Sequence, residues 1–231
     1  MSAPALPPID LAVFDLDGTL IDSERDLVLS VNATLLHMGL PELPLDTIRT
    51  YVGNGAPVLM QRALGVHASG GNLERALAFF LEHYFEHMLD NTALYDGARE
   101  SLDLLHGAGV RLALLTNKPD RNTKGILAGL GLAPLFDRAY GGNAFPLRKP
   151  DPMGLTAIMN ELGVPAARTI MVGDSAVDIR TARNAGVFSA GLTWGFQPEG
   201  FAAEPPDVVY GALLPLAHDI LTVRELTGRR D

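Results

Sequence analysis

Cysteine is absent from all 231 residues of this chain. Its absence excludes disulfide bonds, thiolate nucleophiles and cysteine-based zinc sites, so aspartate, histidine or serine must supply any nucleophile. Basic residues are also scarce, because 18 lysines and arginines stand against 27 acids and leave a net charge of −9. They occur singly or in pairs and form no basic stripe, so nucleic acid is not an expected partner.

Long hydrophobic runs are missing as well. No stretch approaches the ~18 consecutive apolar residues that a membrane span requires, and residues 1–8 lack the charge pattern of a signal peptide. We therefore expect a soluble cytoplasmic protein that does not bind membranes and works as a monomer or homodimer. With 47% hydrophobic residues, the chain can bury a substantial core in one domain with a large insertion, or in two small domains.

Short apolar runs alternate with amphipathic stretches along most of the chain, a pattern typical of strands and helices around a parallel sheet. The spacing predicts strands over residues 11–14, 111–115, 138–140, 169–172, 188–192 and 207–209. It predicts intervening helices over residues 98–105, 120–129, 152–162, 175–185 and 212–223. The expected fold class is therefore α/β, with a doubly wound parallel sheet.

One interval, residues 22–91, breaks this alternation. It contains no convincing strand and instead carries helical periodicity interrupted by glycine and proline, which predicts helices over residues 24–38, 47–51, 56–64 and 73–89. We expect a core domain of residues 1–21 and 92–231, into which a helical domain of residues 22–91 is inserted.

Two aspartates follow the first predicted strand. Asp15 and Asp17 are separated by one residue and precede Gly18, which permits a tight turn. Alternate residues of an extended chain point to the same side, so both carboxylates can face one site at the carboxyl end of the strand. The alternative is that an Asp-Gly pair merely ends the strand in a turn.

Thr116 and Asn117 end the second predicted strand of the sheet, where their hydroxyl and amide groups could hold phosphate oxygens. The same residues would also suit an ordinary turn into a helix. Lys149 lies between Arg148 and Pro150, and a lysine held in such a loop could reduce the repulsion between a carboxylate and a phosphate. As an isolated residue it could equally be solvated.

A further apolar strand ends at Asp174, and Asp178 follows where a helix is expected to start. Carboxylates at strand ends are suitable ligands for Mg²⁺, which prefers oxygen. Alternatively, both acids could simply stabilise the positive end of that helix. His83 and His87 have the spacing of a zinc pair, but neither a Glu-x-x-His context nor a third ligand accompanies them.

Taken in order, the motifs Asp-Leu-Asp-Gly-Thr-Leu-Ile-Asp-Ser, Leu-Leu-Thr-Asn-Lys, Arg-Lys-Pro-Asp-Pro and Val-Gly-Asp-Ser-Ala-Val-Asp span nearly the whole chain. The chain resembles the haloacid dehalogenase superfamily of phosphatases, and within it the phosphoglycolate phosphatase branch. The resemblance implies an α/β core with a helical cap, a bound Mg²⁺ ion, and hydrolysis of a small phosphorylated metabolite through an aspartyl phosphate.

The resemblance also implies a role for each motif residue. Asp15 would be the nucleophile and a magnesium ligand, and Asp17 would be the general acid and base, binding the metal through its carbonyl. The other expected roles are phosphate binding by Thr116 and Asn117, charge stabilisation by Lys149, metal binding by Asp174 and support of the metal site by Asp178.

Residues 50–57 resemble the cap segment of phosphoglycolate phosphatases, although Gly53-Asn54-Gly55 could also be a plain turn. Arg49, Asn54 and Arg62 are the candidates for binding a substrate carboxylate in the cap. Other functions stay open: a broad phosphatase or pyrophosphatase, a sugar phosphomutase of the same fold, and, less favoured, a dehalogenase or a non-catalytic interaction protein. A non-catalytic protein would be expected to lack one or more of four charged residues, and all four are present: Asp15, Asp17, Lys149 and Asp174.

Overall fold

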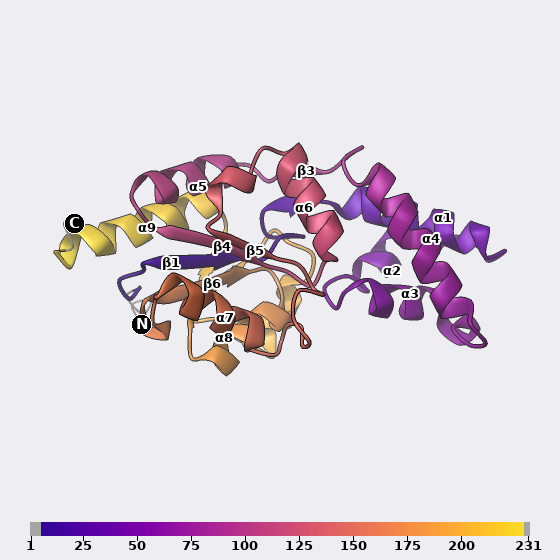
Figure 1. Cartoon of the computed structure of the whole chain (residues 1–231). Helices are drawn as coiled ribbons and strands as arrows, with labels where there is room; N and C mark the ends of the chain where they lie inside the picture. Colours follow the sequence, from indigo (N-terminus) through magenta and orange to yellow (C-terminus); the bar gives the residue numbers. More distant parts are fainter. Residues whose placement is uncertain (1–5, 229–231) are drawn as a thin grey trace.

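Six parallel strands form the centre of the molecule in a computed structural model that describes residues 6–228. Across the sheet the strands are β5 (Arg138–Tyr140), β4 (Arg111–Leu115), β1 (Leu11–Phe14), β6 (Thr169–Gly173), β7 (Phe188–Leu192) and β8 (Val208–Tyr210) (Figure 1). The predicted parallel sheet is confirmed. The last strand begins one residue later than expected, because the Asp207 side chain instead accepts hydrogen bonds from the Ser189 backbone and hydroxyl.

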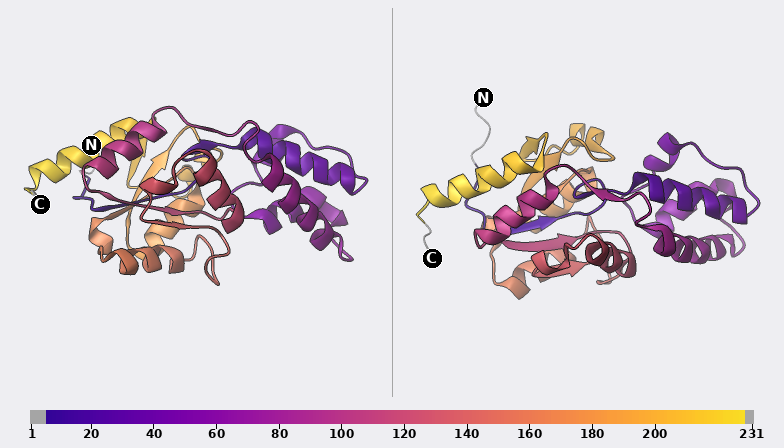
Figure 2. Two further views of the ribbon diagram at one scale, coloured as in Figure 1. Left: turned by 45° about the horizontal axis from the view of Figure 1, so that its top comes forward. Right: turned by 90° about the horizontal axis from the view of Figure 1, so that it is seen from above.

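Alternate residues of the strands belong to two separate hydrophobic clusters, one on each face of the sheet. Ala12 and Phe14 pack with residues of α5 (Ala98–Gly107), α6 (Asp120–Gly129) and α9 (Leu213–Leu226). Leu11 and Val13 pack with residues of α7 (Met153–Leu162) and α8 (Ala176–Ala185). Both faces of the sheet are therefore covered by helices, as Figures 1 and 2 show, and the doubly wound α/β fold is confirmed.

The position of β1 determines where a ligand can bind. Phe14 at its end lies beside Leu114 of β4 and Val172 of β6. The chain passes from β1 to β4 on one side and reaches β6 on the other, so the strand order reverses at β1. In open α/β sheets, ligands bind outside the carboxyl ends of the strands at such a reversal.

The helical interval follows β2 (Ile21–Asp22) and ends before β3 (Ala93–Leu94), and these short strands pair antiparallel. Sequence periodicity cannot reveal strands of this length. Between them lie α1 (Glu24–His37), α2 (Leu45–Arg49), α3 (Ala56–Leu64) and α4 (Asn72–His87). The domain boundaries expected from the sequence, between residues 21 and 22 and between residues 91 and 92, fall within β2 and just before β3.

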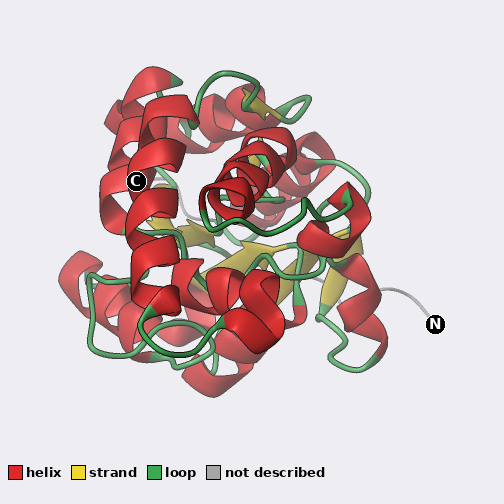
Figure 3. Ribbon diagram, turned by 90° about the vertical axis from the view of Figure 1, so that its right-hand side faces the viewer, coloured by secondary structure: helices red, strands yellow, loops and turns green. Residues whose placement is uncertain are grey.

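The four cap helices gather beyond one end of the sheet (Figures 1 and 2), and Figure 3, viewed from that side, shows helices in front of the strands. Helix α2 starts two residues earlier than predicted, directly after Pro44, whose restricted φ suits a helix start. Residues of α1, α3 and α4 join the same hydrophobic cluster as one face of the sheet. Among the described residues, no helix combines the length and apolar character needed to cross a membrane.

Asp26 links the two chain segments that connect the cap to the core, because it lies at the start of the cap and binds residues 91–92 at its end. Its buried carboxylate lies in the first turn of α1 and accepts hydrogen bonds from the backbone N–H groups of Asn91 (2.9 and 3.0 Å) and Thr92 (2.8 Å). The side chains of Asn91 and Thr92 donate to it as well, at 2.7 and 2.8 Å. The carboxylate thus holds the start of the cap against its end.

We expect Asp26→Ala to lower the free energy of unfolding by about 3 kcal/mol, because it leaves the N–H groups of Asn91 and of the buried Thr92 without this acceptor. Chemical denaturation would measure the loss, with Asp46→Ala as the control because Asp46 is exposed. Equal stability of the two variants would contradict a structural role for Asp26.

Candidate active site

The loop after β1 brings two aspartates to the reversal point of the sheet. The backbone N–H of Asp15 donates to the carbonyl of Val172 at 3.0 Å, which continues the strand pairing by one residue. Asp15 and Asp17 both line the same pocket. Gly18 turns the chain with a φ of 80°, and a Cβ there would lie 2.4 Å from Oδ2 of Asp174, so only glycine fits.

Asn117 links three parts of the site. Its side-chain amide donates to the carbonyl oxygens of Gly53 in the cap and Lys149 in the core, both at 3.0 Å. Thr116, the preceding residue, is buried and lines the pocket with Asn117. Both residues thus lie at the carboxyl end of β4, and Asn117 also holds the loop that carries Lys149.

Lys149 reaches the nucleophile candidate from the loop before α7. Its ammonium lies 2.8 Å from Oδ1 of Asp15 and 2.6 Å from Oδ1 of Asp178. Burial lowers the pKa of Lys149, but the two carboxylates more than offset this, so the net pKa shift is upward and the ammonium stays charged. The expected proximity of Lys149 to Asp15 is therefore present.

Asp178 occupies a capping box at the start of α8. Its Oδ2 accepts hydrogen bonds from the Ser175 backbone at 3.2 Å and from the Ser175 hydroxyl at 2.6 Å, while its Oδ1 faces Lys149. Stabilising the helix and orienting Lys149 are thus done by one side chain. Both oxygens of Asp178 thus have partners within the protein, and its contact with the site is through Lys149.

Asp174 is held by contacts from two other loops. Its Oδ1 accepts a hydrogen bond from the Thr19 hydroxyl at 3.1 Å, and its Oδ2 accepts one from the Phe196 backbone at 2.7 Å. Burial raises the pKa of Asp174 to about 8, and the charges of Asp178 and Asp15 add to the shift. Burial also raises the pKa of Asp15 to about 6, although Lys149 opposes it.

Asp15, Asp174 and Asp178 fit a divalent cation. Each offers a carboxylate oxygen within 4.8 Å of the others, and no other such trio of acids, histidines or cysteines occurs within residues 6–228. One buried ammonium, Lys149, pairs with two of these three acids, Asp15 and Asp178, so full ionisation of the trio leaves excess negative charge. Mg²⁺ takes oxygen ligands, and Asp15 and Asp174 are the residues that would hold it.

The raised pKa values predict an unusual dependence of stability on pH when metal is absent. The ordinary pKa of both carboxyls is 3.8, so between this value and the folded values of about 6 and about 8 the folded chain binds more protons than the unfolded chain. This contribution to stability is complete below the ordinary pKa and is lost as pH rises through the folded pKa values. Mg²⁺ should therefore stabilise the protein more at about pH 8 than at about pH 5.

Calorimetry in EDTA and in Mg²⁺ at both pH values would measure this effect. Asp174→Asn should weaken the fall in metal-free stability, because its side chain does not titrate. An equal pH dependence in the variant and the parent protein would contradict the assignment to Asp174.

The site opens into a pocket between core and cap with an empty volume of about 620 Å³, part of which is open to solvent. Its core side carries Asp15, Asp17, Thr116, Asn117 and Asp174. Its cap side is mostly apolar and includes Leu27, Val52, Ala56, Leu59, Phe80 and Tyr84. The pocket can therefore enclose a small ligand whose polar end faces the core.

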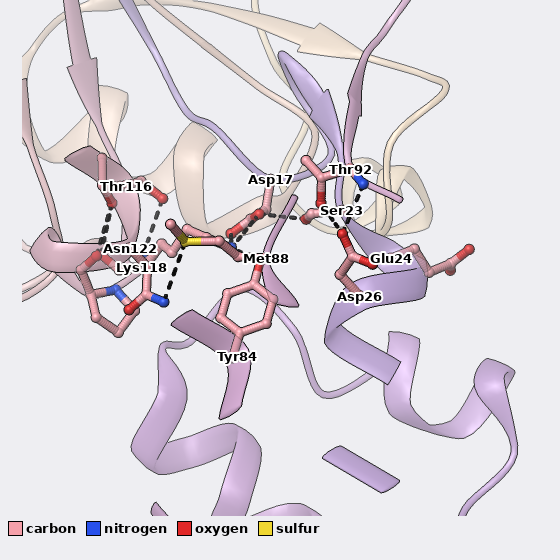
Figure 4. Close-up of polar contacts among 12 residues, drawn as sticks. Asp17, Ser23, Glu24, Asp26, Tyr84, Met88, Thr92, Thr116, Lys118 and Asn122 are labelled. Carbon is pink, nitrogen blue, oxygen red and sulfur yellow. Dashed lines mark hydrogen bonds and ion pairs between the residues drawn. The ribbon is translucent and has the colours of Figure 1, made fainter. Parts of the chain in front are cut away.

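Lys118 is a site residue that the sequence analysis did not single out. Its side chain is 2% exposed, and its ammonium lies 2.8 Å from Oδ1 of Asp17 and 2.5 Å from the hydroxyl of Tyr84 (Figure 4). Burial lowers the pKa of Lys118, but Asp17 and Tyr84 raise the pKa by more than burial lowers it, so the net shift is upward. The available signal was its position, directly after Thr116 and Asn117 at the end of a strand.

The three cap candidates are not among the residues that line the pocket, although Gly53 and Gly55 on either side of Asn54 are. The Arg49 guanidinium donates to the carbonyl oxygens of Gly195 at 2.8 Å and Phe196 at 3.3 Å and pairs with Glu24 at 3.3 Å. Neither Arg49 nor Asn54 nor Arg62 lines the pocket. Arg49 instead connects the cap to the loop that positions Asp174.

The segment around Asn54 lies against the core. Gln197 donates to the carbonyl oxygens of Thr50 and Val52, at 3.2 and 2.9 Å, and Gly55 has a φ of 85°. A Cβ on Gly55 would lie 3.1 Å from the carbonyl oxygen of Asn117. The turn between α2 and α3 therefore also docks the cap onto the site.

The paired histidines of α4 have other partners. His83 contacts the Ser30 hydroxyl at 3.1 Å, and His87 pairs with Asp90 at 2.8 Å. Neither belongs to the trio of acids, found within the described residues, that could hold a metal ion.

Comparisons with known proteins agree with this geometry. Residues 12–192 match the family model of haloacid dehalogenase-like hydrolases. The chain is 42% identical to the phosphoglycolate phosphatase of Pseudomonas putida KT2440 over 96% of this chain and 85% of that protein. It is 40% identical to the phosphoglycolate phosphatase of Vibrio parahaemolyticus over 90% and 94% of the two chains, respectively.

A solved structure gives the same result. The crystal structure of a predicted phosphoglycolate phosphatase from Haemophilus somnus 129PT superposes with a TM-score of 0.87 and 32% identity, covering 91% of this chain and 97% of that one. The chain therefore belongs to the haloacid dehalogenase-like hydrolase family and is an enzyme similar to its phosphatases, as the motifs predicted.

Proposed function

We propose that the protein is a magnesium-dependent phosphatase that forms an aspartyl phosphate on Asp15 and converts 2-phosphoglycolate to glycolate and phosphate. The observation that carries this proposal is the convergence of Asp15, Lys149 and Asp174 at one buried point beside a pocket. The names of relatives about 40% identical over most of the chain support the substrate.

Charge compensation is the first requirement of this reaction. A phosphate monoester is a dianion, so a carboxylate reaches its phosphorus only when cations offset the repulsion. Lys149, 2.8 Å from Asp15, supplies one such charge. Mg²⁺ held by Asp15 and Asp174 would supply further positive charge beside the phosphoryl oxygens. A carboxylate oxygen of Asp15 would then form the acyl phosphate as the ester P–O bond breaks.

Asp17 is suited to the proton transfers. It would protonate the departing glycolate oxygen and then accept a proton from the water that hydrolyses the acyl phosphate. The Ser23 hydroxyl donates to its Oδ1 at 2.5 Å, and Lys118 contacts both of its oxygens, so the carboxylate is oriented before substrate binds. Thr116 and Asn117 would hold phosphoryl oxygens.

Phosphate release tests the proposal against its alternatives. Purified enzyme would be assayed with 2-phosphoglycolate, other phosphorylated acids, sugar phosphates, nucleotides and pyrophosphate, in Mg²⁺ and in EDTA. We expect kcat/KM for 2-phosphoglycolate to exceed the others by at least about tenfold, with loss of activity in EDTA. Similar turnover of many unrelated esters would instead indicate a broad phosphatase or pyrophosphatase.

A sugar phosphomutase would behave differently in the same assay. It would isomerise a sugar phosphate and depend on a sugar bisphosphate, whereas the proposed enzyme releases phosphate without one. Rapid quenching of a turnover with radiolabelled substrate should trap acid-stable label on the protein at Asp15.

We also propose that the enzyme acts in the cytoplasm, as a monomer or homodimer, on a free small metabolite and without nucleic acid. The net charge of −9 and the enclosed pocket between core and cap support this choice of partner.

A further inference from the structure

We propose that Lys118 binds the carboxylate of the substrate's leaving group and thereby selects short phosphorylated acids over phosphorylated alcohols. This inference rests on the proposed phosphatase function and assigns the residue that determines its specificity.

The position of Lys118 restricts what its ammonium can bind. One partner, Asp17, belongs to the core, and the other, Tyr84, belongs to cap helix α4 (Figure 4). The ammonium also lies 4.4 Å from the centre of the Tyr84 ring. A lysine has three N–H donors, and both of these partners lie in the pocket wall. A ligand that meets Lys118 must therefore lie in the space enclosed between cap and core.

The charges around the pocket leave Lys118 as the partner for a second anionic group. Within residues 6–228, it is the only positively charged side chain that lines this pocket, beside three aspartates. Lys149 does not line the pocket and is paired with Asp15 and Asp178. A carboxylate enclosed against the apolar cap wall requires a charged hydrogen-bond donor, since burying an unpaired charge is strongly unfavourable.

The length of the substrate fits this arrangement. As general acid, Asp17 must lie within hydrogen-bond distance of the ester oxygen. Lys118 is 2.8 Å from Asp17, so its ammonium lies close to that oxygen as well. In 2-phosphoglycolate one methylene separates the ester oxygen from the carboxylate. The carboxylate of such a short acid therefore falls within reach of Lys118.

The test compares 2-phosphoglycolate with 2-hydroxyethyl phosphate, in which a neutral alcohol replaces the carboxylate. We expect Lys118→Met to reduce the ratio of their kcat/KM values by about 100-fold, because the substrate carboxylate loses its charged partner. Any loss that acts through Asp17 affects both substrates and cancels in the ratio. Lys118→Gln, which removes the charge but keeps a hydrogen-bond donor, should show the same change if the methionine variant folds poorly.

Binding provides an independent measurement. In an Asp15→Asn background, calorimetry should show that Lys118→Met weakens binding of 2-phosphoglycolate by about 100-fold and that of 2-hydroxyethyl phosphate by less than about threefold. Lys124→Met is the matched control, because Lys124 lies on α6 with its side chain 67% exposed and should leave the ratio unchanged. Tyr84→Phe keeps the ammonium and should retain the preference.

Equal losses for both substrates in Lys118→Met would overturn this inference, since Lys118 would then act only through Asp17. The proposed function would survive that outcome if the parent enzyme still prefers 2-phosphoglycolate. Failure of the parent enzyme to release phosphate from either ester would overturn the proposed function, and this inference with it.

Discussion

Asp15→Asn is expected to reduce kcat by at least about 10⁴-fold with every substrate, because an amide cannot form the acyl phosphate. Asparagine has nearly the same size as aspartate, so the change does not disturb the packing of Asp15 against Lys149, which also pairs with Asp178. Folding should therefore be retained, and substrate should still bind. Steady-state assays at saturating Mg²⁺ and substrate would measure the loss.

The control for this prediction is Asp46→Asn, an equivalent change at an exposed position of the cap. It should leave kcat unchanged. Turnover by Asp15→Asn above a few per cent of the parent enzyme, without trapped label, would contradict the covalent route and require another nucleophile.

Lys149→Met is expected to have the second largest effect, lowering kcat/KM by about 10³-fold. It removes the ammonium that lies 2.8 Å from Asp15 and so leaves the attack on a dianion less compensated. It also leaves Asp15 and Asp178 unpaired in a buried site, which should lower the free energy of unfolding by about 3 kcal/mol. Phosphate release and denaturation would measure the two effects.

A double-mutant cycle that combines Lys149→Met with Asp178→Asn measures how much of the lost stability comes from the ion pair between these two residues. Because Lys149 and Asp178 are 2.6 Å apart, the two substitutions together should destabilise the protein less than the sum of the single changes. Lys124→Met, on the surface of α6, should change neither activity nor stability. Additive destabilisation would contradict a direct ion pair as the source of the effect.

The sequence predicted that polar residues of the core would lie close together, because the order of the strands determines where the residues after them lie. Asp15, Thr116 and Asp174 each follow an apolar strand, and parallel strands end at one edge of a sheet, so these side chains meet whatever the intervening chain does. The cap helices were also recognisable from periodicity, with shifts of one or two residues at their ends. The two-residue strands at the cap boundary were too short to give a pattern.

Residue roles at the border of cap and core depended on packing. Arg49 directly precedes the cap segment of residues 50–57, and Lys118 ends the motif Leu-Leu-Thr-Asn-Lys, but nothing in their spacing indicates which of the two reaches the pocket. The orientation of the cap decides this, since it directs Arg49 to the carbonyl oxygens of Gly195 and Phe196 and places Tyr84 against Lys118.

By itself, the sequence determined the α/β class, the inserted helical segment and the acids at the strand ends, because local periodicity and sheet geometry require no knowledge of distant contacts. Only the tertiary structure decided that Asp178 contacts Lys149 and that Lys118 lines the pocket between core and cap. These facts depend on contacts between segments far apart in the chain, and such contacts leave no periodic pattern in the sequence.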